Sequence, residues 1–322
     1  MRIAVVGTGA VGGYYGAKLA YYGRDVHFLV RSEEERTAMR RFGLQVKSKQ
    51  GSFRVAKVNV RASTAEIGPC DLVLIALKAT ANEALKELLP PLLGPDTMLL
   101  TLQNGLGNED CLAENFGGQR VLGGLCFVCL NKTAPGVIEH QGYGNIALGE
   151  FSGFPLPRTH DVAWEFKRCG VMARVVPDLA EARWRKLVWN IPFNGVTLLA
   201  TAQRPMGSPP VSTADVLADD ALSYLTRRLM DEVIAAARKL GHAIPGDFAD
   251  LQFKRTAEMG PYLPSTLLDH LAGRPIELDA IWGEPYRQAY NAGAEVGRLE
   301  SCLGLLRHLT GLGNIGSTPA KP

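Results

Sequence analysis

Three polar residues spaced by four, Lys186, Asn190 and Asn194, interrupt an apolar stretch of the chain. On a helix this spacing puts them on one stripe. A lysine on a mostly buried helix is costly to desolvate, and burial makes its ammonium a better acid for an oxyanion formed by hydride addition. The two amides would then hold the substrate's oxygens. The alternative is a solvated polar face with the lysine stem reaching water, and spacing alone does not decide between them.

Two residues further along the chain fit the same chemistry. Ser265 follows a proline and begins a short predicted helix, and Glu277 begins a longer one. A serine at a helix start is a good N-cap, and a carboxylate in the first turn is favoured by the helix dipole. These structural roles would suffice for both residues, but a helix start that faces a cleft can also contact a ligand.

A glycine-rich turn near the start of the chain predicts a nucleotide site. A strand over residues 3–6 leads into Gly7-Thr8-Gly9-Ala10-Val11-Gly12, then a helix over residues 13–22 and a second strand over 26–30. Gly7 permits the tight turn, Gly9 lets the backbone approach a diphosphate, and Gly12 lets the helix pack on the strand. The N-terminus of that helix favours bound phosphates. This context predicts a dinucleotide cofactor.

The end of the second strand indicates which dinucleotide binds. NAD sites usually have Asp or Glu about 20 residues after the glycines, to accept hydrogen bonds from the ribose. This chain has Arg31 there, and a guanidinium suits a 2′-phosphate. The sequence therefore predicts NADP (NADPH) rather than NAD. In the alternative, Arg31 is a surface residue paired with Glu33, Glu34 or Glu35.

Further polar residues follow two apolar runs that we predict as buried parallel strands. Lys78 comes after the run at residues 71–77, and Asn104 comes after the run at residues 97–102. The carboxyl ends of parallel strands meet at one sheet edge, where ligands bind. We therefore expect both residues at the cofactor site, although a loop lysine and an Asn-Gly turn are the simpler interpretations.

The whole pattern predicts two domains. Strands and helices alternate up to about residue 178, which indicates an α/β class with a Rossmann-type, doubly wound parallel sheet in an NADP-binding domain over residues 1–178. The stretch at residues 43–60, which is interrupted by glycines, predicts a hairpin. Residues 179–322 read as an all-helical substrate and catalytic domain. Its predicted helices cover residues 181–200, 214–240, 247–258, 265–271 and 278–309, and a disordered tail is expected over 311–322.

Composition excludes several classes of protein. The chain has 322 residues, 46% of them hydrophobic, and a net charge of +3, which is too small to argue for nucleic acid or membrane partners. No signal-peptide pattern precedes the first strand, so we expect a cytoplasmic protein. Cys126 and Cys129 form a C-x-x-C, but no second pair completes a metal site. The last helix can pair with a copy of itself, as in a homodimer, or pack on its own domain.

The chain resembles the ketopantoate reductases (2-dehydropantoate 2-reductases) over nearly its whole length. Besides the glycine motif, the matching residues run in family order: Arg31, Leu77-Lys78, Gln103-Asn104-Gly105, Arg185-Lys186-Leu187, Asn190, Asn194, Ser265 and Glu277. The glycine motif is common to many dehydrogenases. The lysine and two asparagines with the later serine and glutamate are much more specific.

The resemblance implies NADPH-dependent reduction of a 2-keto acid, on the pathway to pantothenate and coenzyme A. It implies that Lys186 is the general acid, that Glu277 holds the substrate's hydroxyl and that Ser265 holds its carboxylate. By the same resemblance, three asparagines complete a pocket between the domains, and two cations meet the adenosine side of NADPH. The asparagines are Asn104, Asn190 and Asn194, and the cations are Arg31 and Lys78.

The sequence also departs from the family's pattern. The family commonly has proline after the second asparagine of the stripe, where this chain has Gly195. Pro192 lies within the stripe instead, which predicts a kink in the helix. We therefore keep two alternatives: a reductase of another branched or bulky 2-keto acid, and a NADPH-binding sensor without turnover. Because a pure binder needs no proton donor, Lys186 and Glu277 argue against the sensor.

Overall fold

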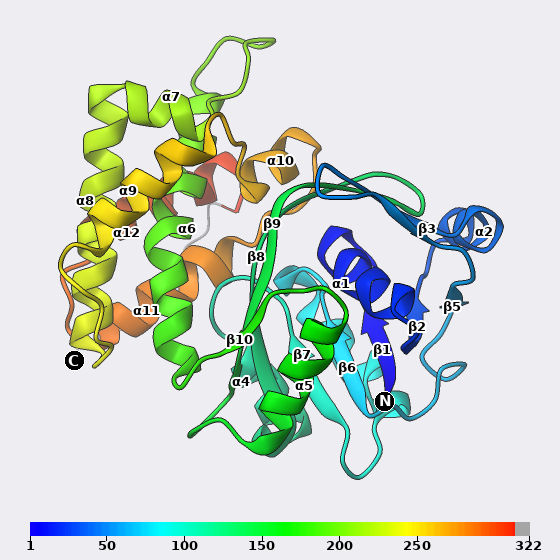
Figure 1. The fold of residues 1–322 in the computed structure, drawn as a ribbon. Helices are drawn as coiled ribbons and strands as arrows, with labels where there is room; N and C mark the ends of the chain where they lie inside the picture. The colour runs from blue at the N-terminus through cyan, green and yellow to red at the C-terminus, as the bar shows by residue number, and fades with distance from the viewer. Residues whose placement is uncertain (313–322) are drawn as a thin grey trace. The chain divides into compact units, whose positions relative to one another are not determined.

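The computed structural model describes residues 1–312, so most of the expected disordered tail at 311–322 lies outside the described residues. The chain folds into two compact units, one of residues Met1–Leu179 and one that begins at Ala180. The first unit is an α/β structure and the second is helical (Figure 1).

The N-terminal unit contains a Rossmann-type sheet. Six strands run parallel in the order β5-β2-β1-β6-β7-β8, which is the doubly wound order 3-2-1-4-5-6 when they are counted along the chain. The fold class expected from the sequence is confirmed. The strands are β1 (Arg2–Val6), β2 (Asp25–Leu29), β5 (Asn59–Arg61), β6 (Leu72–Ile75), β7 (Met98–Thr101) and β8 (Val121–Ala134).

Short helices connect these strands. Between β6 and β7, residues Ala79–Ala84 form a 3₁₀ segment, and the four residues Leu85–Leu88 are α-helical before Pro90 and Pro91 end the helix. The helical elements of this part are α1 (Ala10–Tyr21), α2 (Glu33–Phe42), η1 (Ala79–Ala84), α3 (Leu85–Leu88), η2 (Pro90–Leu92), α4 (Asn108–Phe116) and η3 (Gly118–Arg120).

A long hairpin extends the sheet. β8 pairs antiparallel with β9 (Val137–Glu150), and the two strands run together in Figure 1. The expected hairpin at 43–60 is present as β3 (Leu44–Ser48) and β4 (Phe53–Val55), with β3 parallel to β9. The sheet is therefore mixed at this end. β10 (Ala173–Val175) pairs with β9 after helix α5 (Pro157–Arg168).

Both faces of the sheet are buried, as the continuous apolar strands predict. Alternate side chains of β1 enter different cores: Ile3 and Val5 belong to the cluster beneath α1, and Ala4 and Val6 belong to the cluster on the other face. All four are fully buried. This rigid support fixes the end of β1, where the glycine turn begins.

The C-terminal unit is helical, but two long predicted helices are broken. The helix expected at 214–240 stops at Asp219, whose carboxylate accepts the N–H groups of Ala221 and Leu222 at 3.0 and 2.9 Å and so starts a new helix. The helix expected at 278–309 is three elements. The elements are α6 (Leu179–Ala202), α7 (Thr213–Ala218), α8 (Asp220–Lys239), α9 (Phe248–Met259), α10 (Ser265–Leu271), the π-helix η4 (Asp279–Gly283), α11 (Glu284–Asn291) and α12 (Gly297–Leu309).

Helix α6 runs through Pro192 as one helix of 24 residues. The indole N–H of Trp282, in the π-helix, donates to the carbonyl of Ile191 at 3.2 Å. A Cβ at Gly195 would come within 2.8 Å of the Cys302 sulfur. The departure from the family at Gly195 therefore has a packing cause in this chain, because Trp282 and Cys302 fill the space beside the helix.

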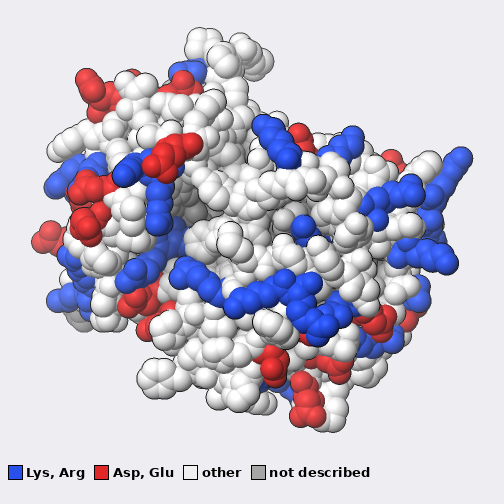
Figure 2. All heavy atoms as spheres, viewed as in Figure 1, with Lys and Arg blue, Asp and Glu red and all other residues white. Residues whose placement is uncertain are grey.

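The surface carries both signs of charge. Figure 2 shows Lys and Arg side chains interspersed with Asp and Glu on the face in view, in keeping with the small net charge. Within residues 1–312, none of the helices combines the length and the apolar character that a membrane span requires.

Candidate active site

The glycine turn joins β1 to α1, and two of its glycines have no room for a side chain. Gly7 has a φ of +105°, and a Cβ there would overlap the backbone of Ala76. A Cβ at Gly12 would overlap the carbonyl of Gly7 and come within 2.9 Å of the Ala76 Cβ. These two glycines let the loop turn and let α1 lie against the sheet.

Gly9 differs from them. It is the N-cap of α1 in an ordinary extended conformation (φ −80°, ψ −159°), and a Cβ there would meet nothing within 4 Å. The turn thus leaves open space beside the N-terminus of a helix, where N–H groups and the helix dipole attract anions. A dinucleotide's diphosphate fits this combination, so the residues present suit the predicted cofactor. Ala10 and Val11 form the first turn of α1.

Arg31 lies just beyond β2, with its side chain exposed to solvent. Two of the three carboxylates that could have paired with it bind elsewhere: Glu33 binds Arg36, and Glu35 binds Lys132. The Arg36 guanidinium also donates to the carbonyls of residues 30 and 31 at 2.7 Å. Within residues 1–312, Arg31 itself forms no ion pair, so its guanidinium stays available to an anionic ligand.

The ends of β6 and β7 carry the other predicted residues of this unit. Lys78 is exposed and precedes the 3₁₀ segment after β6. Asn104 follows β7, and its carbonyl accepts the Asn108 side-chain amide at 2.9 Å. The amide oxygen of Asn108 accepts the side-chain N–H of Asn82 at 3.0 Å, and the amide oxygen of Asn82 accepts the side-chain N–H of Gln103 at 2.7 Å. Sequence reasoning missed Asn82 and Asn108, although amides near a strand end are a usable signal.

The three polar residues predicted to form a stripe lie on α6, but they differ in how deeply they are buried. Lys186 is partly buried, whereas Asn190 and Asn194 are 8% and 2% exposed. The Asn194 amide donates to the carbonyl of Asn190 at 2.9 Å and accepts the N–H of Thr266 at 3.2 Å. Asn194 therefore ties α6 to the first turn of α10, beside Ser265.

The side-chain amide of Asn190, in contrast, takes part in none of the hydrogen bonds within residues 1–312, where the residue is bonded through its backbone alone. Asn190 is 8% exposed, and its amide is not among the completely buried polar atoms that lack a partner, so it borders open space. Buried polar groups are usually hydrogen-bonded, so an amide that borders open space on a largely buried residue and has no protein partner is a candidate ligand-binding group. It lies one helical turn after Lys186 on the same face of α6.

Ser265 and Glu277 stand at element starts, as expected, but not in the expected capping role. Pro264 is the N-cap of α10, and Ser265 is an exposed first-turn residue whose side chain caps nothing. Glu277 is 5% exposed and precedes the π-helix. π-Helices occur frequently at functional sites.

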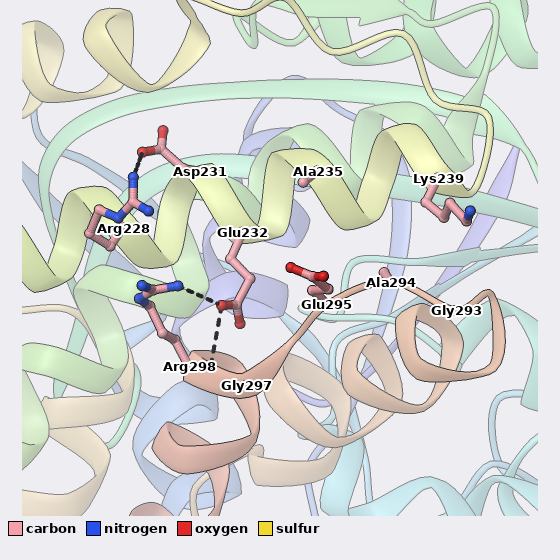
Figure 3. Close-up of a pocket in the computed structure, with 10 residues that line it drawn as sticks. All are labelled: Arg228, Asp231, Glu232, Ala235, Lys239, Gly293, Ala294, Glu295, Gly297 and Arg298. Carbon is pink, nitrogen blue, oxygen red and sulfur yellow. Dashed lines mark hydrogen bonds and ion pairs between the residues drawn. The ribbon is translucent and has the colours of Figure 1, made fainter.

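A separate pocket of about 730 Å³ in this unit is lined by both signs of charge. Figure 3 shows Glu232 of α8 directed at the start of α12, where it accepts the N–H of Leu299 at 2.7 Å and that of Arg298 at 3.2 Å. The Glu232 carboxylate thus satisfies the first N–H groups of α12, which is a structural role.

The cysteines belong to no candidate metal site among residues 1–312. In the part of the chain that the structure describes, no three His, Cys, Asp or Glu side chains are grouped to hold a metal ion. None of the six cysteines forms a disulfide. Cys126 and Cys129 lie in β8 and are buried.

Known proteins match the chain along its length. The family profile "Ketopantoate reductase PanE/ApbA" matches residues 3–153, and "Ketopantoate reductase PanE/ApbA C terminal" matches residues 178–310. The chain belongs to the ketopantoate reductase family. It is therefore an oxidoreductase, and the resemblance inferred from its motifs is confirmed.

Individual ketopantoate reductases agree with this assignment. A 2-dehydropantoate 2-reductase of Nostoc sp. is 38% identical over 98% of this chain and 97% of its own length. The crystal structure of a 2-dehydropantoate 2-reductase from Geobacter metallireducens has a TM-score of 0.91 at 42% identity, over 96% of this chain and all of that one. D-mandelate dehydrogenase with NADH and anilino(oxo)acetate shares the fold, with a TM-score of 0.85 at 19% identity, over 98% of this chain and all of that one.

Proposed function

We propose that this protein reduces 2-dehydropantoate to pantoate with NADPH, in the biosynthesis of pantothenate and coenzyme A. The observation that carries the proposal is the face of α6 on which partly buried Lys186 and the unpartnered amide of Asn190 lie one turn apart. Membership of the ketopantoate reductase family supports the choice of substrate. Six cysteines without a disulfide suit a reducing compartment such as the cytoplasm.

In the proposed reaction the bound nicotinamide supplies a hydride to the carbonyl carbon of the 2-keto acid. The Lys186 ammonium gives its proton to the carbonyl oxygen, so that a hydroxyl forms without a free alkoxide. The Asn190 amide donates to a substrate oxygen. The Ser265 hydroxyl donates to the substrate carboxylate, and Glu277 accepts a hydrogen bond from the substrate's own hydroxyl.

The fold leaves the choice of cofactor open, since D-mandelate dehydrogenase has the same fold with NADH. The preference for NADPH is supported by Arg31, an exposed guanidinium after β2. A guanidinium donates to phosphate oxygens in a bidentate manner and cannot accept a ribose hydroxyl, so it favours the 2′-phosphate. Lys78, exposed after β6, would add a second positive charge to this end of the cofactor.

Turnover by the wild type and Lys186 variants tests the proposal. NADPH oxidation is followed by absorbance with 2-dehydropantoate, beside a panel of other branched 2-keto acids. We expect the wild type to turn over 2-dehydropantoate fastest. Lys186→Ala and the charge-preserving Lys186→Arg should each lower kcat by about 10²–10⁴-fold, because arginine is a poor acid at neutral pH.

NADPH binding, measured by fluorescence titration, should stay unchanged in both variants and serves as the control. Unchanged turnover in Lys186→Arg would remove Lys186 from the mechanism. Faster turnover of another keto acid would replace the substrate and keep the reaction. NADPH binding without turnover of any keto acid would favour the sensor.

A further inference from the structure

A lysine far along the chain reaches the glycine turn. Lys132, near the end of β8, donates from Nζ to the carbonyl of Thr8 at 3.2 Å and forms an ion pair with Glu35 in the first turn of α2. Both charged side chains are largely buried, with 29% and 13% of their surfaces exposed. One ammonium thus joins the glycine turn to the start of α2.

The same corner is fixed by two shorter contacts. The Thr8 hydroxyl donates to the carbonyl of Leu29, the last residue of β2, at 2.9 Å. The Ser32 hydroxyl accepts the N–H of Glu35 at 3.3 Å. The glycine turn, the end of β2 and the start of α2 are therefore held together at the corner where the adenosine ribose of a dinucleotide binds in this fold.

The negative charge of Glu35 is unfavourable for binding a 2′-phosphate at that corner. A carboxylate there suits ribose hydroxyls and repels a 2′-phosphate. One of its oxygens, Oε1, is buried without a hydrogen-bond partner within residues 1–312, and the other is bound by Lys132. In the nearby Glu33–Arg36 pair the two charges neutralise each other, so Lys132 is the residue that neutralises the charge of Glu35.

We propose that Lys132 determines cofactor specificity: by neutralising Glu35 beside the glycine turn, it lets this corner accept a 2′-phosphate. The inference rests on the NADPH preference proposed above. Arg31 supplies the attraction for the phosphate, and Lys132 removes a repulsion. Lys132 acts through Glu35 and the loop, so it is a positioning residue.

Fluorescence titration of NADPH and NADH on the whole protein tests this role. Lys132→Ala leaves the Glu35 charge unpaired, so the Kd for NADPH should rise about tenfold while the Kd for NADH changes about twofold or less. Lys132→Arg should keep the wild-type ratio. Adding Glu35→Gln to Lys132→Ala should restore most of the NADPH affinity. The loss should also shrink at high salt.

A matched control is Lys86→Ala, which breaks an exposed lysine–glutamate pair with Glu83 elsewhere in the same unit and should leave both dissociation constants unchanged. If Lys132→Ala weakened the binding of NADPH and NADH equally, Lys132 would only stabilise the glycine turn, and the proposal would be overturned. Failure of Glu35→Gln to rescue would overturn it as well.

The wild-type ratio separates this test from the test of the proposed function. If the wild type binds NADH better than NADPH, the NADPH assignment fails. The role of Lys132 still stands in that case if its loss lowers NADPH affinity selectively and Glu35→Gln restores it.

Discussion

The glycine turn and helix α6 prepare for their ligands in opposite ways. The turn offers backbone N–H groups and empty space, because a Cβ at Gly9 would meet nothing within 4 Å. Helix α6 offers buried side chains, one of which, Asn194, is occupied by the protein itself. The first kind of site is broken by adding atoms, and the second by removing them.

The largest effect on cofactor affinity should come from adding one methyl group to the turn. In Gly9→Ala the new Cβ enters the space intended for the diphosphate, so the Kd for NADPH should rise by about 100-fold, or ~2.7 kcal/mol. The extended backbone of Gly9 accepts alanine, so the melting temperature should stay that of the wild type. Fluorescence titration and thermal unfolding measure the two quantities.

Gly12→Ala is the matched control in the same loop. Its Cβ would overlap the Gly7 carbonyl, so it should lower the stability of the fold by about 1–3 kcal/mol. NADPH affinity in Gly9→Ala equal to that of the wild type would contradict the diphosphate assignment and would remove the contrast with α6.

Removing the Asn190 side chain from α6 should have the next largest effect. Asn190→Ala should lower kcat/KM by about 10–100-fold, because hydrogen bonds to charged groups contribute roughly 1.5–3 kcal/mol. Its melting temperature should hardly change, since the Asn190 side chain bonds no protein group within residues 1–312. Steady-state kinetics and thermal unfolding check both outcomes.

Asn194→Ala gives the comparison within the stripe. It leaves the buried N–H of Thr266 without its acceptor, so it should destabilise the fold by about 1–3 kcal/mol. If both variants lost the same stability, Asn190 would be a structural residue like its neighbour. The prediction that Asn194 also contacts the substrate stays a prediction, and the kinetics of this variant test it.

Much of this could be predicted from the sequence, because local pattern encodes it. Apolar strands and turn glycines indicated the doubly wound sheet, and four-residue spacing put Lys186 and Asn190 on one helix face. The helix breaks were harder. Asp219 caps α8 inside a stretch whose apolar periodicity predicts one continuous helix. The π-helix after Glu277 has no sequence signature of its own.

Contacts distant in sequence could not be predicted at all. Lys132 and Glu35 are 97 residues apart, and only the course of the β8–β9 hairpin brings them together. The expectation that Ser265 caps α10 was wrong because Pro264 takes the N-cap position. The capping role of Glu232 depends on α8 and α12 meeting, which no local pattern states.

The smallest predicted effect concerns pH and the support of the glycine turn. His140 is buried at 3% exposure, bonds Ser48 at 2.9 Å and packs on Tyr14 of α1 at 4.7 Å between ring centroids. Burial lowers the pKa of His140 below its ordinary value of 6.5. The unfolded chain therefore binds its proton first, so this contribution to stability is complete above pH 6.5 and is lost as the pH falls below it.

Thermal unfolding between about pH 7.5 and pH 5.5 should show this loss as a small decrease in the melting temperature as the pH falls. His140→Gln should flatten the part of the slope that belongs to this residue, whereas His27, whose pKa is also lowered by burial, should keep its own part. An unchanged slope in His140→Gln would refute the assignment. Helix α1 begins at the glycine turn and packs on His140 through Tyr14. Mild acid should therefore weaken cofactor binding at the glycine turn by destabilising α1, without adding or removing an atom at the turn.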